Sequence, residues 1–183
     1  MLVAMQPEPW LRGPMSGIPP AVQPLLFSFA QIREDLERHT AGLTNEDVWK
    51  PAVGGGTLGF HLRHIAGSVE RLTGYLFGEQ VSDAQLAQLK GESEPTGTLA
   101  ELLAGIERSF AAAEERVKKL DPASLFEPRY VGRKQMPTTV LGLLVHIAEH
   151  SQRHLGQAIT IAKALRASAA AAPVSPSYTG TRP

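Results

Sequence analysis

The chain has 183 residues, of which 43% are hydrophobic, and its 18 basic and 18 acidic side chains balance. This length predicts one domain with a sizeable core, and the balanced charge gives no reason to expect nucleic acid or an anionic membrane as a partner. The lack of cysteine excludes disulfides, cysteine-type zinc sites and a cysteine nucleophile. No uninterrupted apolar segment is long enough to span a membrane, and the N-terminus lacks a signal-peptide pattern, so we expect a cytoplasmic protein.

The two ends of the chain differ in composition from its middle. Residues 1–19 are rich in proline and glycine, which disfavour a helix, so we predict a proline-rich arm. Trp10 and Leu11 are expected to attach this arm to the body of the protein. Residues 167–183 contain mostly Ala, Ser, Thr, Gly and Pro and are predicted to be a disordered tail.

The middle of the chain, residues 20–166, has the pattern of a helical bundle. Apolar residues recur at three- and four-residue steps in four segments, which predicts amphipathic helices over about residues 20–41, 57–78, 98–120 and 138–166. Residues 44–47 resemble a helix cap, residues 82–89 can form a short helix, and residues 129–136 can be extended. Four helices of this length predict an all-α fold, a four-helix bundle.

The histidines are unevenly distributed. Five of the six lie in two short segments of the predicted helices: His61, His64, His146, His150 and His154. The last three follow one another at four-residue intervals, which places them on one face of a helix. The first two lie beside Ser68 and Tyr75 at the edge of an apolar face. This clustering indicates a metal site between two helices.

Spacing alone leaves the ligand set open. Two imidazoles at i and i+4 can bind one ion, but three successive ones would span about 12 Å along the axis, so at most two of them bind. Either His146 with His150, or His150 with His154, satisfies this limit. The missing ligand has to come from the other segment. Imidazoles suit zinc, nickel, copper or iron, and a site with three of them leaves a position for water or substrate, which is typical of catalysis.

Two motifs give the chain a resemblance to the DinB-like family of metal-binding four-helix bundles. Residues 64–71 read H-I-A-G-S-V-E-R, and residues 146–157 read H-I-A-E-H-S-Q-R-H-L-G-Q. The family signature has a His four residues before a second His that is followed by x-G-Q, and the remaining ligand is the His of an H-x-A motif. The resemblance therefore implies His64, His150 and His154 as ligands, an up-down-down-up topology, and often a homodimer.

The resemblance also implies a cofactor and a class of chemistry. Members bind zinc or nickel, and some are transferases or isomerases that use low-molecular-weight thiols. We therefore predict a metal-dependent enzyme that activates water or a small thiol for hydrolysis or transfer of a small-molecule substrate. The alternative is a non-catalytic bundle that binds a metal or small ligand. His61, Tyr75, His146 and Gln157 are predicted to surround the metal or line a pocket, and no catalytic residue is assigned. Glu149 is expected to be an ordinary surface carboxylate.

Overall fold

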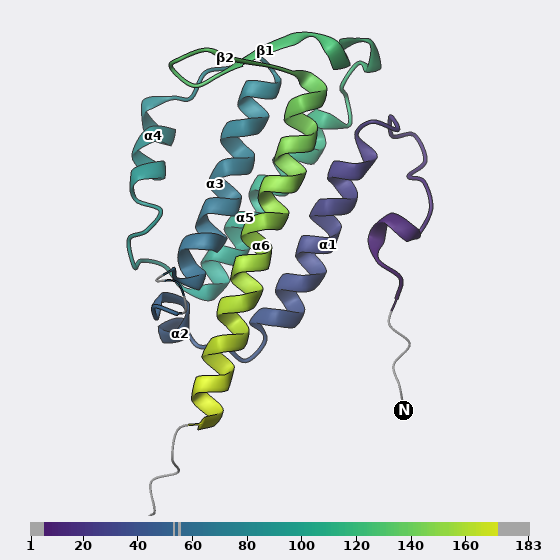
Figure 1. The fold of residues 1–183 in the computed structure, drawn as a ribbon. Coiled ribbons are helices and arrows are strands. Elements are labelled where there is room, and N and C mark those ends of the chain that lie inside the picture. Colours follow the sequence, from purple (N-terminus) through teal and green to yellow (C-terminus); the bar gives the residue numbers. More distant parts are fainter. Residues whose placement is uncertain (1–5, 53, 55, 172–183) are drawn as a thin grey trace, which may run out of the picture.

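The computed structural model describes residues 6–52, 54 and 56–171, and these residues are mostly helical. Four long helices lie side by side (Figure 1): α1 (Gln23–Thr40), α3 (Leu58–Leu76), α5 (Leu99–Val117) and α6 (Val140–Ala171). The other elements are short: η1 (Pro9–Leu11), α2 (Asn45–Trp49), α4 (Asp83–Lys90), η2 (Pro122–Phe126), β1 (Pro128–Val131) and β2 (Met136–Thr139). The four long helices that the apolar periodicity predicts are therefore present.

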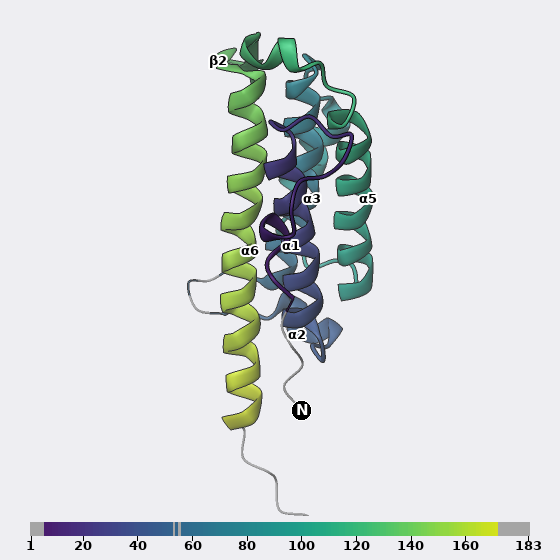
Figure 2. The same cartoon turned by 90° about the vertical axis from the view of Figure 1, so that its right-hand side faces the viewer.

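The core lies where the four long helices meet. Helix α3 packs against both α5 and α6, and α1 packs against α6. Figure 2 shows α6 along one side of the bundle and α5 along the other, with α1 and α3 between them. Between α1 and α5, the rings of Phe29 and Phe110 stack with centroids 4.0 Å apart, and both side chains are fully buried. Because α3 packs against both α5 and α6, its apolar face is buried between them. Its histidines lie at the edge of that face.

Side-chain caps fix where several helices begin. Thr44, Ser82 and Thr98 each accept a hydrogen bond from a backbone N–H in the first turn of α2, α4 and α5, and each belongs to a capping box. Thr57 accepts from the backbone N–H of Phe60 at the start of α3. These caps satisfy first-turn donors that have no partner within the helix. The predicted cap at residues 44–47 is confirmed.

Two helix ends differ from the predicted ones. Helix α1 begins at Gln23 rather than at residue 20, and Pro24 occupies its first turn, where a missing N–H leaves no hydrogen bond unmade. Helix α6 continues to Ala171, beyond the predicted end at Arg166, because its alanine-rich end favours helix. Residues 172–183 of the predicted tail lie outside the described residues. Among the described helices, none is both long and apolar enough to cross a membrane.

An antiparallel β-hairpin stands between α5 and α6, so the fold is mostly helical rather than strictly all-α. In it, Pro128 pairs with Thr139 and Val131 with Met136. The turn between the strands contains Gly132 at φ 71°, in the left-handed region that glycine enters without steric cost. Short strands with a turn carry no helical periodicity, which is why the sequence indicated only an extended segment here.

Polar contacts attach the N-terminal arm to α1. Both terminal nitrogens of Arg12 donate to the carboxylate of Glu34, at 2.6 and 2.8 Å. Trp10 and Leu11, which were expected to attach the arm, remain 61% and 56% exposed. That expectation was wrong, because the buried Pro9, the packing of Met15 and Ile18 on the core, and the Arg12–Glu34 pair make the attachment instead.

Candidate metal centre

The clustered histidines face one another where α3 packs against α6. The Nε2 atoms of His64 and His150 are 2.9 Å apart, and the Nδ1 atoms of His61 and His154 are 3.0 Å apart. The His64 and His154 rings also approach closely, with centroids 4.2 Å apart. Packing of the two helices thus brings together side chains that are far apart in the sequence.

Three of these histidines are arranged so that they could hold one metal ion. His64, His150 and His154 each offer one ring nitrogen, and the three nitrogens lie within 4.8 Å of one another. A tetrahedral ion with bonds of about 2.0–2.1 Å needs nitrogens separated by about 3.3 Å, so small side-chain movements suffice. Three imidazoles without a thiolate suit zinc or nickel among other divalent ions. These are the three residues that the family resemblance implies.

Burial favours the neutral form of the ring, which is the form that binds metal. Burial and the neighbouring His64 lower the pKa of His154 to about 4. Burial and the same neighbour lower the pKa of His150 and of His61. At neutral pH these rings are therefore in the neutral form, which can offer a ring nitrogen to a metal.

The structure adds a carboxylate that the sequence did not assign. Glu92 lies just after α4, is only 3% exposed, and has Oε2 2.6 Å from Nδ1 of His64. Its other oxygen is 2.9 Å from Nη1 of Arg71, which is also buried. Burial tends to raise the pKa of Glu92, but the hydrogen bond with His64 and the charge of Arg71 outweigh it, so the pKa is lowered. Glu92 is therefore an ionised acceptor behind His64.

Contacts from α3 and α2 hold the segment that carries Glu92. Arg63 of α3 donates to the carbonyl oxygens of Gly91 at 3.0 Å and Glu94 at 2.7 Å, and also to that of Thr96. The Arg63 guanidinium lies 4.8 Å from the ring centroid of Trp49, which is a cation–π contact. Arg63 also donates to the carbonyl oxygen of Glu92 at 3.5 Å, so one arginine holds four backbone carbonyls of an irregular segment.

A cavity of about 250 Å³ opens beside the histidines. His64 and His150 lie on its wall, together with Tyr75 and His146. Its apolar lining comes from α3, α4 and the connection between them: Leu72, Val81, Leu86 and Leu89. A small molecule in this cavity would lie next to the proposed ligands. Tyr75 and His146 are thus placed beside the cavity, and their role stays a prediction.

The other residues that the sequence singled out have different surroundings. His61 is 9% exposed and contacts His154. The side chain of His146 is 46% exposed and lies 2.7 Å from Glu149, which also pairs with an arginine one turn later. Gln157 is exposed and, in the described part of the chain, forms no hydrogen bond with the histidines. His61 is therefore the one of these three that touches a proposed ligand through a ring nitrogen.

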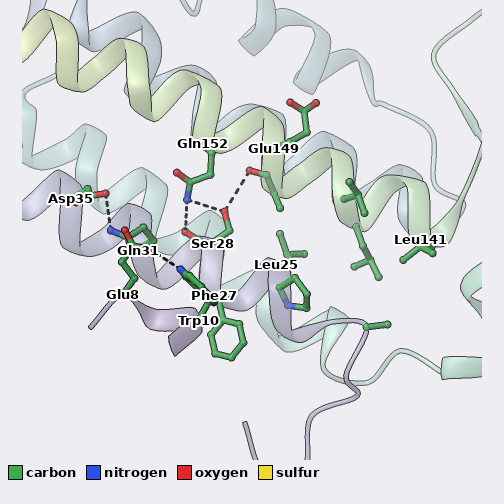
Figure 3. A pocket seen from close by; sticks show the side chains of 15 residues that line it. Glu8, Trp10, Leu25, Phe27, Ser28, Gln31, Asp35, Leu141, Glu149 and Gln152 are labelled. Atoms are coloured by element: carbon green, nitrogen blue, oxygen red, sulfur yellow. Dashed lines mark hydrogen bonds between the residues drawn. The ribbon is translucent and has the colours of Figure 1, made fainter. Parts of the chain in front are cut away.

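A larger cavity, of about 970 Å³, lies between α1 and α6 beside the N-terminal arm (Figure 3). Leu25, Leu141 and Trp10 contribute to its walls, and the amide of Gln152 donates to the hydroxyl and carbonyl oxygens of Ser28. None of the five clustered histidines lines it. Volume therefore does not identify the chemical site, and the smaller cavity is the one beside the clustered histidines.

Comparisons with known proteins add one finding to this geometry. A search of curated proteins gives no match. The sequence model of the DinB superfamily matches residues 28–158, which is more than half of the chain and includes the whole histidine cluster and Glu92. The chain therefore belongs to the DinB superfamily.

Proposed function

We propose that the protein is a metal-dependent enzyme in which His64, His150 and His154 bind one divalent ion, zinc or nickel. The observation that carries this proposal is the approach of the three ring nitrogens to within 4.8 Å of one another, beside a cavity. A bound ion of this kind lowers the pKa of water or of a small thiol, which makes a nucleophile available near neutral pH. The proposed reactions are hydrolysis or transfer to a low-molecular-weight thiol.

The residues of the cavity set limits on the substrate. A volume of about 250 Å³ is below the usual range for drug-sized ligands, so the substrate is a small molecule or presents one small group. Leucine and valine side chains on the wall reduce access of water, which strengthens electrostatic interactions at the site. The Tyr75 hydroxyl is a candidate for binding a polar atom of the substrate.

Turnover with and without metal tests the enzyme proposal. Chelator-treated protein is reloaded with zinc or nickel and incubated with small electrophiles, in the presence and absence of low-molecular-weight thiols. We expect product formation that needs the ion and disappears in Leu72→Trp, a change that fills the cavity without removing a proposed ligand. Product formation that is equal with and without metal would contradict the proposal.

The second candidate is a non-catalytic bundle that binds a small ligand. The observation that favours it is the mostly apolar cavity of about 970 Å³ between α1 and α6, which is separate from the histidines. An apolar fluorescent dye that binds there should be displaced in Ala148→Trp and not in Leu72→Trp. Dye binding together with no turnover under any metal condition would favour this candidate over the enzyme.

We also infer the up-down-down-up helix order that the resemblance implies. Ser28 of α1 donates to Ala148 of α6, and Arg166 of α6 donates to Ala41 just after α1, which supports the same direction for both helices. The facing histidine pairs support the opposite direction for α3, and its contacts with α5 support a shared direction for those two. The homodimer and the thiol partner rest on the resemblance alone and stay predictions.

A further inference from the structure

The two ring nitrogens of His64 have different partners. Nδ1 lies 2.6 Å from Oε2 of Glu92, whereas Nε2 faces Nε2 of His150 at 2.9 Å. An ionised carboxylate can only accept hydrogen bonds, so Nδ1 of His64 has to carry the proton. A neutral imidazole has one proton, which leaves a lone pair on Nε2. The carboxylate of Glu92 thus favours the tautomer whose free nitrogen points toward His150.

Arg71 lies beside Glu92 and supplies a compensating charge. A carboxylate that is 3% exposed is unfavourable in its ionised form unless it is paired. Nη1 of Arg71 lies 2.9 Å from Oε1 of Glu92, an ion pair without hydrogen-bond geometry, and the other carboxylate oxygen faces His64. Arg71 is itself 8% exposed, and the pair is therefore largely shielded from water.

Gly67 of α3 provides the space for this pair. A Cβ atom at Gly67 would lie 2.7 Å from Nη1 of Arg71 and 2.7 Å from Oε1 of Glu92, which is closer than real Cβ contacts. Both atoms are at the ends of flexible side chains, so an added methyl group would displace the pair rather than the backbone. Gly67 lies one turn before Arg71 on the same face, which lets the arginine fold back along the helix toward Glu92.

We propose that Glu92 and Arg71, with Gly67 as the space beside them, are positioning residues that select the metal-binding tautomer of His64. Neither side chain is a ligand in this proposal. It rests on the proposed metal site for its consequence, which is tighter metal binding, but the tautomer itself can be measured in the metal-free protein. Loss of such a partner of a ligating histidine typically lowers metal affinity about 10- to 100-fold.

The direct test is the tautomer of His64 in metal-free Glu92→Gln, read by ¹⁵N NMR of the imidazole ring. The amide oxygen of the introduced glutamine will pair with Arg71, because that arginine can only donate. The amide NH₂ then donates to Nδ1 of His64, and the ring proton moves to Nε2. We expect an Nδ1–H ring in the wild type and an Nε2–H ring in the variant. The same tautomer in both proteins would overturn the proposal.

A double variant tests the part played by Arg71. In Glu92→Gln with Arg71→Met, nothing holds the amide oxygen away from His64, so the amide can turn and accept from Nδ1–H. We expect the Nδ1–H signal to return, at least in part. If the pair were purely structural, the double variant would lose more of the Nδ1–H signal instead of regaining it. A double variant in which the Nδ1–H signal does not return would overturn the orienting role of Arg71.

Zinc affinity, measured by competition with a chromophoric chelator, tests the consequence. We expect zinc to bind Glu92→Gln about 10- to 100-fold more weakly than the wild type. Zinc should also bind Gly67→Ala more weakly than the wild type. Gly105→Ala on α5 is the matched control, because its Cβ would meet only the end of Arg108 at an ordinary 3.8 Å. Circular dichroism confirms that each variant is folded.

The outcomes separate this inference from the proposed function. If the wild type binds no zinc, the metal proposal fails, and the NMR result still decides the tautomer. If the wild type binds zinc and Glu92→Gln binds it equally well, the metal proposal stands and the positioning role is overturned.

Discussion

Nε2 of His64 and Nε2 of His150 lie 2.9 Å apart across the contact between α3 and α6. At this distance only one of the two nitrogens can carry a proton, which it then donates to the other. In the proposed metal-bound form, a divalent ion would take the place of that proton between the two nitrogens. The same pair of atoms thus forms a contact between the two helices and belongs to two of the proposed ligands.

The metal should stabilise the folded protein. An ion that binds only the folded state raises the unfolding free energy, by about 2.7 kcal/mol when its free concentration is 100 times the dissociation constant. We expect zinc to raise the Tm of the wild type, measured by differential scanning calorimetry, and to have little effect on His150→Ala. His39→Ala, which changes a histidine outside the cluster, should keep the full shift. An equal shift in His150→Ala would mean that zinc binds elsewhere.

The metal-free protein should lose stability as the pH falls from about 7 toward 5. In the unfolded chain a histidine has a pKa of about 6.5, whereas burial and its histidine neighbours lower the pKa of His154 to about 4 in the folded protein. The unfolded state therefore binds more protons than the folded state in this range. The stability that neutral His154 contributes is complete above the unfolded pKa and is lost as the pH falls. The Tm of chelator-treated protein should fall with pH, and less steeply in His154→Asn. A Tm that is constant over this range contradicts the expectation.

The stacked rings of Phe29 and Phe110 should be a main source of core stability. Both side chains are fully buried, so Phe110→Ala removes apolar contacts and leaves a cavity, at a cost of about 3–5 kcal/mol. Urea unfolding measures this loss. Phe126→Ala is the matched control, because Phe126 is 77% exposed, and it should change stability little. Similar effects of the two substitutions would contradict the packing described for α1 and α5.

Arg63 should control the order of the segment between α4 and α5. Arg63→Ala removes its hydrogen bonds to the carbonyl groups of Gly91 and Glu94, so this segment should open more often. Hydrogen exchange followed by mass spectrometry should show faster exchange in residues 91–98. Arg108→Ala, at an exposed position of α5, should leave exchange in these residues unchanged. Unchanged exchange in Arg63→Ala would mean that other contacts hold the segment.

The sequence predicted the long helices and the histidine triad for different reasons. Apolar periodicity indicates a helix and its buried face, since both follow from one geometric repeat. Spacing could not choose between His146 and His154 as the second ligand on α6, because that choice depends on where α3 meets α6. In the structure His154 faces α3, whereas the side chain of His146 is 46% exposed and contacts Glu149.

Glu92 could not have been found in the same way. Its segment reads G-E-S-E-P-T-G, which has no periodicity, and its position depends on contacts with Arg63 that only the folded chain makes. Arg71 was within reach of sequence reasoning, because it lies seven residues after His64 and thus on the same face of the helix. The β-hairpin has no apolar repeat long enough to distinguish it from an extended loop.

The central claim is a metal bound by three histidines, and elemental analysis of the purified protein tests it most directly. The wild type is compared with His64→Ala, His150→Ala and His154→Ala, all expressed without a histidine tag, loaded with zinc or nickel and dialysed. The account predicts about one ion per chain in the wild type and loss of that ion in each variant. A wild type that retains no metal after loading, or variants that retain as much as the wild type, would contradict it.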